Sequence, residues 1–375
     1  MSAGTRGRRV IVVGGGPAGL GVAGALRRFG VNEVIVYERE QHAGGAPRHT
    51  DHLGFGLRDL HRLMTGPAYA RRITADAAKA GVQVHTGYPV FDVDSLDADA
   101  IVLATGVRER PRSARLVPGD RPAGVFTTGT VQQLTALHGR QVGARAVIVG
   151  AEHVSFSAIL SLRHGGCRTV AMITPYPQHQ TYAPLRLATA TRLRVPIRLD
   201  VDVAQIIGRS RVEAVLLTDG SRIACDTVVF TGGWVGEHEL ARRAGVPQNA
   251  AKSPIVDLSW RTQRVGVFAA GNLVHPAETA DICALGGRRV AAAVLAFLDG
   301  ETWPTTVAGL QCESPVLWAA PAASGITLRT STSGRARVVA RSAQGTLVHR
   351  SRRRTLRPNR AIHIPACGAA SITLE

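Results

Sequence analysis

Short apolar runs followed by glycine-rich turns organise the first 300 residues of the chain. Residues 9–14 form an apolar run, residues 18–29 have the spacing of a helix, and residues 33–37 form a second apolar run. A second unit with the same order begins at residue 146 and ends near residue 173. Strand, helix and strand in succession predict parallel βαβ units. The chain is therefore expected to be an α/β protein with two Rossmann-like dinucleotide-binding domains.

The pattern changes towards the C-terminus. Three more apolar runs that end in small residues are expected to be strands: 100–103, 227–230 and 266–270. Residues 280–298 have the pattern of a helix. After about residue 305 the chain is rich in Ser, Thr, Gly and Arg, with short alternating runs at 325–330 and 336–340. This composition predicts a small β-rich region.

The high positive charge of the chain bears on the kind of partner that it binds. The 375 residues carry a formal net charge of +18, and ten arginines without any acid lie between Arg329 and Arg360. All but two of the 45 basic residues are arginines, which is typical of a compositional bias, so we expect no nucleic-acid binding. The basic tail is expected to be either a solvated face or a docking surface for an acidic partner.

The apolar runs and the cysteines argue against a membrane span and against sites built on cysteine pairs. The longest purely apolar run, Val290–Leu298, has nine residues, far fewer than the roughly 20 that span a bilayer. The N-terminus lacks the pattern of a secretory signal, so we expect a cytoplasmic protein without a membrane span. The five cysteines form no C-x-x-C pair, which argues against a zinc ribbon and a redox-active dithiol. No metal site is predicted.

A glycine-rich turn joins the first strand to the first helix, in the sequence Gly14-Gly-Gly-Pro-Ala-Gly19. Its G-x-G-x-x-G spacing in this context predicts a dinucleotide site. Gly14 permits a tight turn, Gly16 lets a pyrophosphate approach the backbone, and Gly19 lets the helix pack on the strand. The carboxylate of Glu38, at the end of the second strand, is placed to accept hydrogen bonds from ribose hydroxyls. This pattern alone suits either NAD or FAD.

The order of the motifs resembles the two-dinucleotide-binding-domain flavoproteins, a family that includes thioredoxin and glutathione reductases. The resemblance implies FAD at the first turn, with the chain returning to it at Ala104-Thr105-Gly106 and at Gly271-Asn272. Asn272 stands where an Asp is usual in that family. The resemblance implies an FAD-binding domain at 1–113 and 252–303, an NAD(P)-binding-like domain at 114–251 and a basic β-rich C-terminal region at 304–375.

A closer resemblance rests on the segments 44–58, 65–69, 121–130 and 269–275. They look like the flavoprotein subunits of opine oxidase, hydrogen cyanide synthase and bacterial glycerol-3-phosphate dehydrogenase complexes. The likeness implies a dehydrogenase that works beside a second flavoprotein or an iron–sulfur protein. Together with the glycine motif, it assigns further residues to the FAD site: Pro17, Ala18, Arg39, Gly45, Arg48, Val90, Ala104, Thr105, Gly106, Gly271, Asn272, Glu278 and Thr279.

The second glycine turn departs from the dinucleotide pattern. Its sequence is Gly150-Ala-Glu-His-Val-Ser155, so Glu152 and Ser155 replace the second and third glycines. Glu152 adds bulk and negative charge where a pyrophosphate would approach the backbone. The residues after the next strand, 173–177, supply neither an acid nor an arginine for the ribose. We therefore expect weak or absent NAD(P)H binding, unless the side chain of Glu152 turns outward.

Candidate catalytic residues follow the Gly44-Gly45 turn. A base is needed to accept the proton of an amine or hydroxyl when hydride passes to flavin. His49 and His52 are candidates for this base, and the alternative for each, which the loop position favours, is a purely structural histidine. Arg48 is expected to bind either the cofactor phosphates or a substrate carboxylate, or to form a surface ion pair. Glu278 is expected either to lie at the flavin edge or to cap the helix at 280–298.

The leading functional hypothesis is an FAD-dependent dehydrogenase or oxidase that takes hydride from a small CH–NH or CH–OH substrate. One alternative is an NAD(P)H-dependent flavoprotein reductase. The other is an electron-transfer subunit of a multi-subunit dehydrogenase whose substrate chemistry lies on another chain.

Overall fold

A computed structural model describes residues 7–181, 187, 192–276, 278–365 and 367–375. Its first sheet has five parallel strands in the order β17-β6-β1-β2-β5. The central strand β1 consists of β-branched residues after Arg9, and is buried on both faces as the inner strand of a parallel sheet must be. The five strands are β17 (Val267–Ala269), β6 (Ala100–Leu103), β1 (Arg9–Val13), β2 (Glu33–Glu38) and β5 (Gln83–Thr86).

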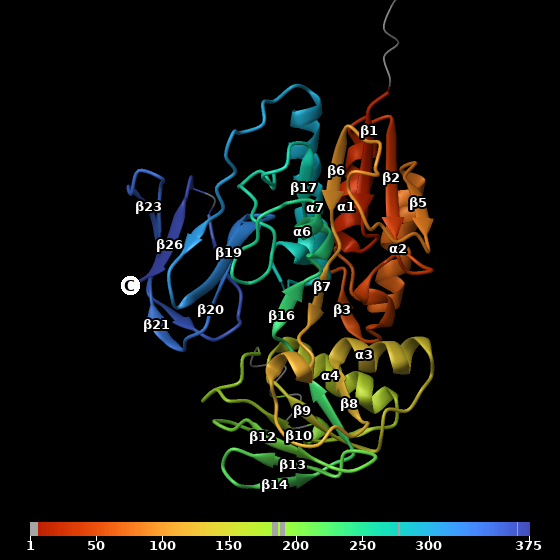
Figure 1. Ribbon diagram of the computed structural model, residues 1–375, viewed down its shortest axis with the longest axis vertical. Coiled ribbons are helices and arrows are strands. Elements are labelled where there is room, and N and C mark those ends of the chain that lie inside the picture. The colour runs from red at the N-terminus through yellow and green to blue at the C-terminus, as the bar shows by residue number, and fades with distance from the viewer. Residues whose placement is uncertain (1–6, 182–186, 188–191, 277, 366) are drawn as a thin grey trace, which may run out of the picture.

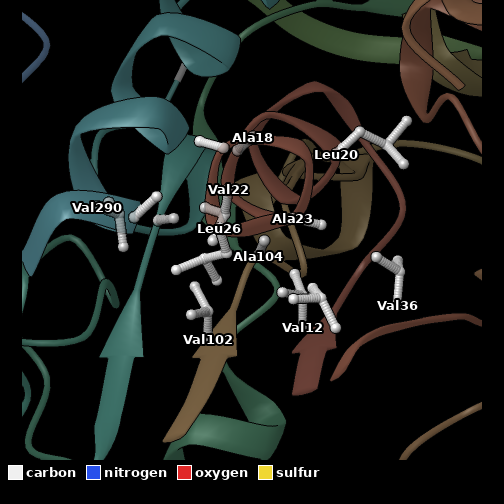
Figure 2. Close-up of a cluster of buried hydrophobic side chains, with 14 of the residues drawn as sticks. Val12, Ala18, Leu20, Val22, Ala23, Leu26, Val36, Val102, Ala104 and Val290 are labelled. Carbon is white, nitrogen blue, oxygen red and sulfur yellow. The ribbon is translucent and has the colours of Figure 1, made fainter. Parts of the chain in front are cut away.

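Three helices, α1 (Pro17–Arg28), α2 (Gly66–Lys79) and α7 (Ala280–Leu298), pack with this sheet. Figure 2 shows side chains of α1 and α7 meeting those of β1, β2 and β6 in one apolar cluster. Small residues let α1 and α7 approach closely, because a Cβ on Gly21 would lie 2.6 Å from the carbonyl oxygen of Ala284. The two helices therefore pack as one layer, and this packing fixes the positions of their N-termini relative to each other.

The second sheet is also parallel, with five strands in the order β11-β10-β9-β15-β8. Helices α3 (Thr128–Gln132) and α4 (His153–His164) accompany it, and a separate three-stranded antiparallel sheet lies beside it. The strands of the two sheets are β8 (Val125–Thr127), β9 (Arg145–Val149), β10 (Arg168–Ile173), β11 (Ile197–Arg198), β15 (Thr227–Phe230), β12 (Val203–Ile207), β13 (Ala214–Leu217) and β14 (Arg222–Ala224).

Two crossover strands connect the first fold to the second. Strand β7 (Val107–Glu109) leaves the first domain directly after Gly106, and β16 (Trp234–Gly236) returns from the second. The two pair antiparallel. Helix α6 (Glu239–Arg243) follows β16. Figure 1 shows the second fold below the first, with β7 and β16 between them.

The C-terminal region is built of short strands beside the first fold (Figure 1). Strand β20 (Gly325–Thr330) has the predicted bounds, whereas the run expected at 336–340 divides into β21 and β22. These strands share an apolar cluster of their own. The others are β18 (Gln311–Cys312), β19 (Val316–Ala322), β21 (Gly334–Ala336), β22 (Val338–Arg341), β23 (Leu347–Arg350), β24 (Arg354–Leu356), β25 (Ile362–Ile364) and β26 (Ser371–Leu374).

The architecture confirms the predicted fold class of two Rossmann-like folds with a β-rich C-terminal part. The exact domain boundaries stay a prediction. Within the part of the chain that the structure describes, no helix is long and apolar enough to cross a membrane. All five cysteines are free thiols, and Cys167, Cys225 and Cys283 are buried. The described residues contain no group of three or more metal-ligating side chains.

Candidate dinucleotide sites

The first glycine turn is shaped by contacts that a side chain would prevent. Gly14 has a φ of +112°, and a Cβ there would lie 2.3 Å from the carbonyl oxygen of Ala104. A Cβ on Gly19 would lie 1.9 Å from the carbonyl oxygen of Gly14. Gly16 differs, because the nearest atom to its Cβ would be 3.9 Å away. Packing therefore requires Gly14 and Gly19, whereas the space in front of Gly16 is left open on the side of helix α1.

Glu38 lies at the same edge of the sheet, as predicted from its spacing. It is 8% exposed, and its two carboxylate oxygens accept hydrogen bonds from the backbone N–H groups of Gly15 and Glu40, each at 2.8 Å. The carboxylate is therefore held against the glycine turn and can still accept further hydrogen bonds. With Pro17 and Ala18 opening α1 beside it, the turn has the open backbone, helix N-terminus and acid that a dinucleotide requires.

The loop of Gly44 and Gly45 closes over this turn. The N–H of Gly44 donates to the carbonyl oxygen of Gly15 at 2.7 Å, and a Cβ on Gly45 would lie 2.9 Å from the Cα of Gly16. Arg48, in the short 3-10 helix at Ala46–His49, forms an ion pair with Glu40. Of the roles expected for Arg48, the ion pair is the one observed, while the backbone of Gly45 borders the open space.

The turn Ala104-Thr105-Gly106 abuts Gly14 and is fixed by the returning crossover. The hydroxyl of Thr105 donates to the carbonyl oxygen of Glu237 at 2.7 Å, and the N–H of Glu237 donates to the carbonyl oxygen of Gly106 at 2.9 Å. The carboxylate of Glu237 pairs with Arg108 at 2.8 Å and lies 3.6 Å from exposed Arg39. Sequence reasoning missed Glu237, because 131 residues separate it from Gly106.

Two other cofactor candidates lie apart from the glycine turn. Val90 is half-buried and packs with Tyr37, on the opposite face of the sheet from α1. It lines a hollow of about 430 Å³ with Tyr37 and Tyr88, whose rings stack at 4.4 Å. The N–H of Tyr88 donates to the carbonyl oxygen of Glu38 at 2.9 Å, which ties this loop to the ribose edge. The assignments of Val90 and Arg39 stay predictions.

At the late motif, Gly271 has a φ of +66°, and a Cβ there would lie 2.4 Å from that of Ala18. The amide of Asn272 both donates to the carbonyl oxygen of Glu278, at 3.0 Å, and accepts from the N–H of Glu278, at 2.9 Å. An Asp could make the second bond but not the first. The replacement of the usual Asp is therefore explained by the segment that precedes α7.

Glu278 is not the cap of α7. Thr279 occupies the N-cap position, while the carboxylate of Glu278, 6% exposed, accepts from the hydroxyl of Thr327 at 3.1 Å and lies 3.7 Å from Arg329. Both partners belong to β20. Next to this group His275 is completely buried, and its burial lowers the pKa of its imidazole. The C-terminal region thus reaches the start of α7 through a buried polar cluster.

Sequence reasoning also missed Asp281, in the first turn of α7. Its carboxylate accepts hydrogen bonds from the N–H groups of Gly56 at 2.8 Å and Arg58 at 2.9 Å. The loop at 56–58 is thereby fixed to the helix that begins beside the first site. An acid in the first turn of a predicted helix is the signal that could have indicated this.

The two candidate bases have different surroundings. His49 is 7% exposed, burial lowers the pKa of its imidazole, and its Nδ1 has no hydrogen-bond partner among the described residues. In His52, Nδ1 lies 2.8 Å from the carbonyl oxygen of Leu53 and Nε2 lies 2.7 Å from the hydroxyl of Ser157 on α4. His52 therefore joins the two dinucleotide folds. A catalytic role for either histidine stays a prediction.

In the second glycine turn the side chain of Glu152 points towards Thr231 and Gly232. The hydroxyl of Thr231 donates to its carboxylate at 2.8 Å, and a Cβ on Gly232 would lie 2.2 Å from the same oxygen. The hydroxyl of Ser155 also meets Thr231, at 2.8 Å. The side chain does not turn outward as the alternative required. Bulk and charge therefore occupy the approach to this turn.

A second acid, Glu109 at the end of β7, lies near Glu152. It is 7% exposed and accepts from the N–H of Gly129 at 2.8 Å, while its other carboxylate oxygen is buried without a partner among the described residues. Burial raises the pKa of Glu109 to about 7; the charge of Glu152 also raises this pKa, and the nearby Arg115 lowers it. Two acids thus border a turn that normally receives phosphates.

Several known proteins with similar sequences are reductases or reductase components. The chain is 29% identical over 285 residues to the ferredoxin reductase component of chlorobenzene dioxygenase from Cupriavidus sp., covering 70% of this chain and 66% of that protein. It is 24% identical over 307 residues to the CoA-dependent NAD(P)H sulfur oxidoreductase of Pyrococcus abyssi, covering 76% and 65%. The chain thus spans just under two thirds of the length of these relatives.

Solved structures share the fold. Thioredoxin reductase of T. acidophilum matches with a TM-score of 0.66 at 19% identity, over 78% of this chain and 100% of that chain. The NAD-dependent persulfide reductase of A. fulgidus matches with a TM-score of 0.58 at 19% identity, over 89% and 68%. The profile of the pyridine nucleotide-disulphide oxidoreductases matches residues 8–297. The family resemblance predicted from the order of the motifs is thereby confirmed, and the chain belongs to the pyridine nucleotide-disulphide oxidoreductase family.

Proposed function

We propose that this protein is an FAD-dependent reductase that takes electrons from NAD(P)H and passes them to a separate electron-carrier protein. The observation that carries the proposal is the pairing of two dinucleotide folds through β7 and β16, with the glycine turn of the first fold matching an FAD site. The reductase components among its relatives support it, and they favour it over the oxidation of a small CH–NH or CH–OH substrate.

The residues of the first fold would hold FAD in defined ways. The N-terminus of α1 and the open backbone at Gly16 would receive the pyrophosphate, and Glu38 would accept hydrogen bonds from the ribose. The N-terminus of α7 would stabilise negative charge. Bound flavin supplies the ability to accept a hydride and to release electrons to a partner. Asn272 holds the segment before α7, and Asp281, in the first turn of α7, holds the loop at 56–58.

The acids of the second fold set the expected affinity for the nucleotide. Glu152 must leave its contact with Thr231 for a pyrophosphate to approach the turn, and Glu109 adds a like charge nearby. We therefore expect NAD(P)H to bind weakly in the wild type. Replacing Glu152 by Gly removes both the bulk and the charge, whereas Glu152→Gln removes the charge alone.

The test is an anaerobic titration of the flavin band at about 450 nm with NADPH and with NADH. We expect at least one of them to bleach the wild type, and Glu152→Gly to need a lower nucleotide concentration for half-reduction. Glu152→Gln should lie between the two. The proposal fails if neither nucleotide bleaches the wild type or Glu152→Gly, while dithionite reduces both.

A second candidate function is favoured by the same carboxylate. If Glu152 permanently excludes nucleotide, electrons would enter from a small amine or hydroxy compound, with His49 or His52 as base. This matches the resemblance to the flavoprotein subunits of opine oxidase and related complexes, which we keep as a proposal. Bleaching by an amino acid, opine or polyol, without response to NAD(P)H, would establish it. A second flavoprotein or an iron–sulfur subunit would then be the expected partner.

A further inference from the structure

The segment after β10 contains arginines but no acidic residue. In dinucleotide folds an acid beyond the second strand binds the 2′-hydroxyl of the adenosine ribose, whereas an arginine accommodates a 2′-phosphate. From Thr174 to Leu199 the sequence contains four arginines and no Asp or Glu. The segment therefore lacks the group that would favour NADH.

Part of this segment forms a wall beside the second glycine turn. The N–H of Gln180 donates to the carbonyl oxygen of Ala151 at 3.0 Å, which places residues 178–181 against the turn. His179 and Thr181 are 9% and 1% exposed. Their carbonyl oxygens accept hydrogen bonds from Arg357, which belongs to the C-terminal region.

That residue belongs to a tight turn between β24 and β25 of the C-terminal region, Arg357-Pro-Asn-Arg360. The N–H of Arg360 donates to the carbonyl oxygen of Arg357 at 3.2 Å, and Asn359 has a φ of +58°. Pro in the second position and Asn with positive φ in the third are the residues that a type II turn favours. Asn359 is fixed to β20, because its N–H donates to the carbonyl oxygen of Thr330 at 3.1 Å and its carbonyl oxygen accepts from Arg329.

The turn reaches the second fold at the wall beside the glycine turn. Nη1 of Arg357 donates to the carbonyl oxygens of His179 at 3.3 Å and Thr181 at 3.4 Å. Burial raises the pKa of the Tyr176 hydroxyl, as does the charge of Glu152, whereas the side chain of Asn359 lowers it. Both bonds of Arg357 are long and end on neutral oxygens, and no ion pair involves it among the described residues.

We propose that the C-terminal region completes the second dinucleotide site, with Arg357 binding the 2′-phosphate of NADPH, so that the protein prefers NADPH to NADH. This inference rests on the proposed function, because it assigns the nucleotide that the same site accepts. A guanidinium whose charge is unneutralised and whose position is fixed by a tight turn suits a doubly charged phosphate, which it can bind through two parallel hydrogen bonds.

The test compares adenosine 2′-monophosphate with adenosine by calorimetry on the FAD-loaded protein. These two probes differ in the 2′-phosphate alone, and neither carries a 5′-phosphate that would meet Glu152. We expect the wild type to bind the 2′-monophosphate about tenfold more tightly or better. Arg357→Leu should lose that preference and keep its affinity for adenosine, which also shows that the variant is folded.

Arg353→Leu is the matched control. Arg353 lies in the same arginine-rich stretch but bonds to the carbonyl oxygen of Arg335, within the C-terminal region, at 3.3 Å. It should keep the full preference. Arg357→Lys should keep part of it, because the charge remains without the two-pronged geometry.

Equal binding of the two probes by the wild type overturns the inference without any variant, and so does a preference that survives in Arg357→Leu. If neither probe binds but NADH bleaches the flavin, this inference fails and the proposed function stands. If neither probe binds and neither NADH nor NADPH bleaches the flavin, both fail.

Discussion

At the scale of single residues, Asn272 shows how one amide can replace a more usual acid. Its oxygen and nitrogen both bond to the backbone of Glu278, so the turn after β17 and the start of α7 are held by two hydrogen bonds. The Asn272 amide fixes the distance between Gly271 and the N-terminus of α7. Its side chain is therefore a structural link as well as a candidate ribityl contact.

We expect Asn272→Asp to destabilise the protein by about 1–3 kcal/mol and to weaken retention of FAD, because a carboxylate would face the carbonyl oxygen of Glu278. Asn249→Asp is a matched control, since the Oδ1 of Asn249 accepts from the N–H groups of Ala251 and Ser253 and a carboxylate can do the same. Thermal midpoints and bound flavin measure the difference. Equal losses in the two variants would contradict the account of Asn272.

Glu109 predicts a pH dependence of stability. Below about pH 4.5 its carboxyl is protonated in both the folded and the unfolded chain, so it has no differential effect. As the pH rises to about 7, the value to which burial raises its pKa, the unfolded chain ionises first and the fold loses stability. The interval corresponds to roughly 3 kcal/mol at most. Above it the loss stays constant.

The variant Glu109→Gln keeps an acceptor for the N–H of Gly129 but cannot ionise. Its thermal midpoint should therefore rise relative to that of the wild type as the pH increases from about 5 to about 8. A constant difference between the two proteins over that range would mean that the carboxyl of Glu109 has an ordinary pKa.

Local spacing explains which site residues the sequence could predict. Gly14, Gly16, Gly19 and Glu38 belong to one βαβ unit, where the chain itself brings them together. Glu237 and Arg357 meet their partners through tertiary contacts across more than 100 residues, and no local pattern marks them. The ion pair of Arg48 with Glu40 lies close in the sequence but could not be singled out, because an arginine in a loop can pair with several kinds of group.

At the scale of elements, a line of polar contacts joins the loop after Gly45 to α3 and α4. The hydroxyl of Ser157 lies 2.7 Å from Nε2 of His52 and accepts from Nε2 of Gln132 at 3.0 Å. Asp51 and His164 lie 3.7 Å apart on the same interface. The first site's loop and the second fold are therefore held together by side chains from both.

Ser157→Ala removes the atom shared by His52 and Gln132. We expect a cost of about 1–2 kcal/mol and faster amide hydrogen exchange at residues 50–56, because that loop loses its bond to α4. Ser161→Ala, one turn further along α4, is the control, since its hydroxyl donates to a carbonyl oxygen within the same helix. Unchanged exchange at 50–56 in Ser157→Ala would show that the loop is held by other contacts.

Elements were more predictable than their assembly. Parallel strands buried on both faces give continuous apolar runs, so β6 and β15 have the predicted bounds. The antiparallel strand β20 has the bounds predicted from its alternating pattern. In the C-terminal region the alternating run at 336–340 covers parts of two strands, β21 and β22. Because these strands pair in different sheets, the alternation alone could not show the boundary between them. Pairing partners depend on the tertiary fold, which periodicity does not encode.

At the scale of the whole molecule, the C-terminal region connects both dinucleotide folds. Thr327 and Arg329 reach Glu278 before α7, and Arg357 reaches the wall of the second turn. In Figure 1 this region lies beside the first fold with its lower end towards the second. A region that the sequence marks as a basic tail is thus placed to affect both sites.

The central claim is that the first glycine turn binds FAD, and the most direct measurement is the flavin content of purified wild type, Gly16→Ala and Gly24→Ala. A Cβ on Gly16 meets nothing closer than 3.9 Å, and one on Gly24 meets nothing closer than 3.5 Å, so both variants should fold. We expect one FAD per chain in the wild type and in Gly24→Ala, and loss of most of it in Gly16→Ala, whose methyl group would occupy the pyrophosphate's approach. Full FAD content in Gly16→Ala, or none in the wild type, would contradict the account.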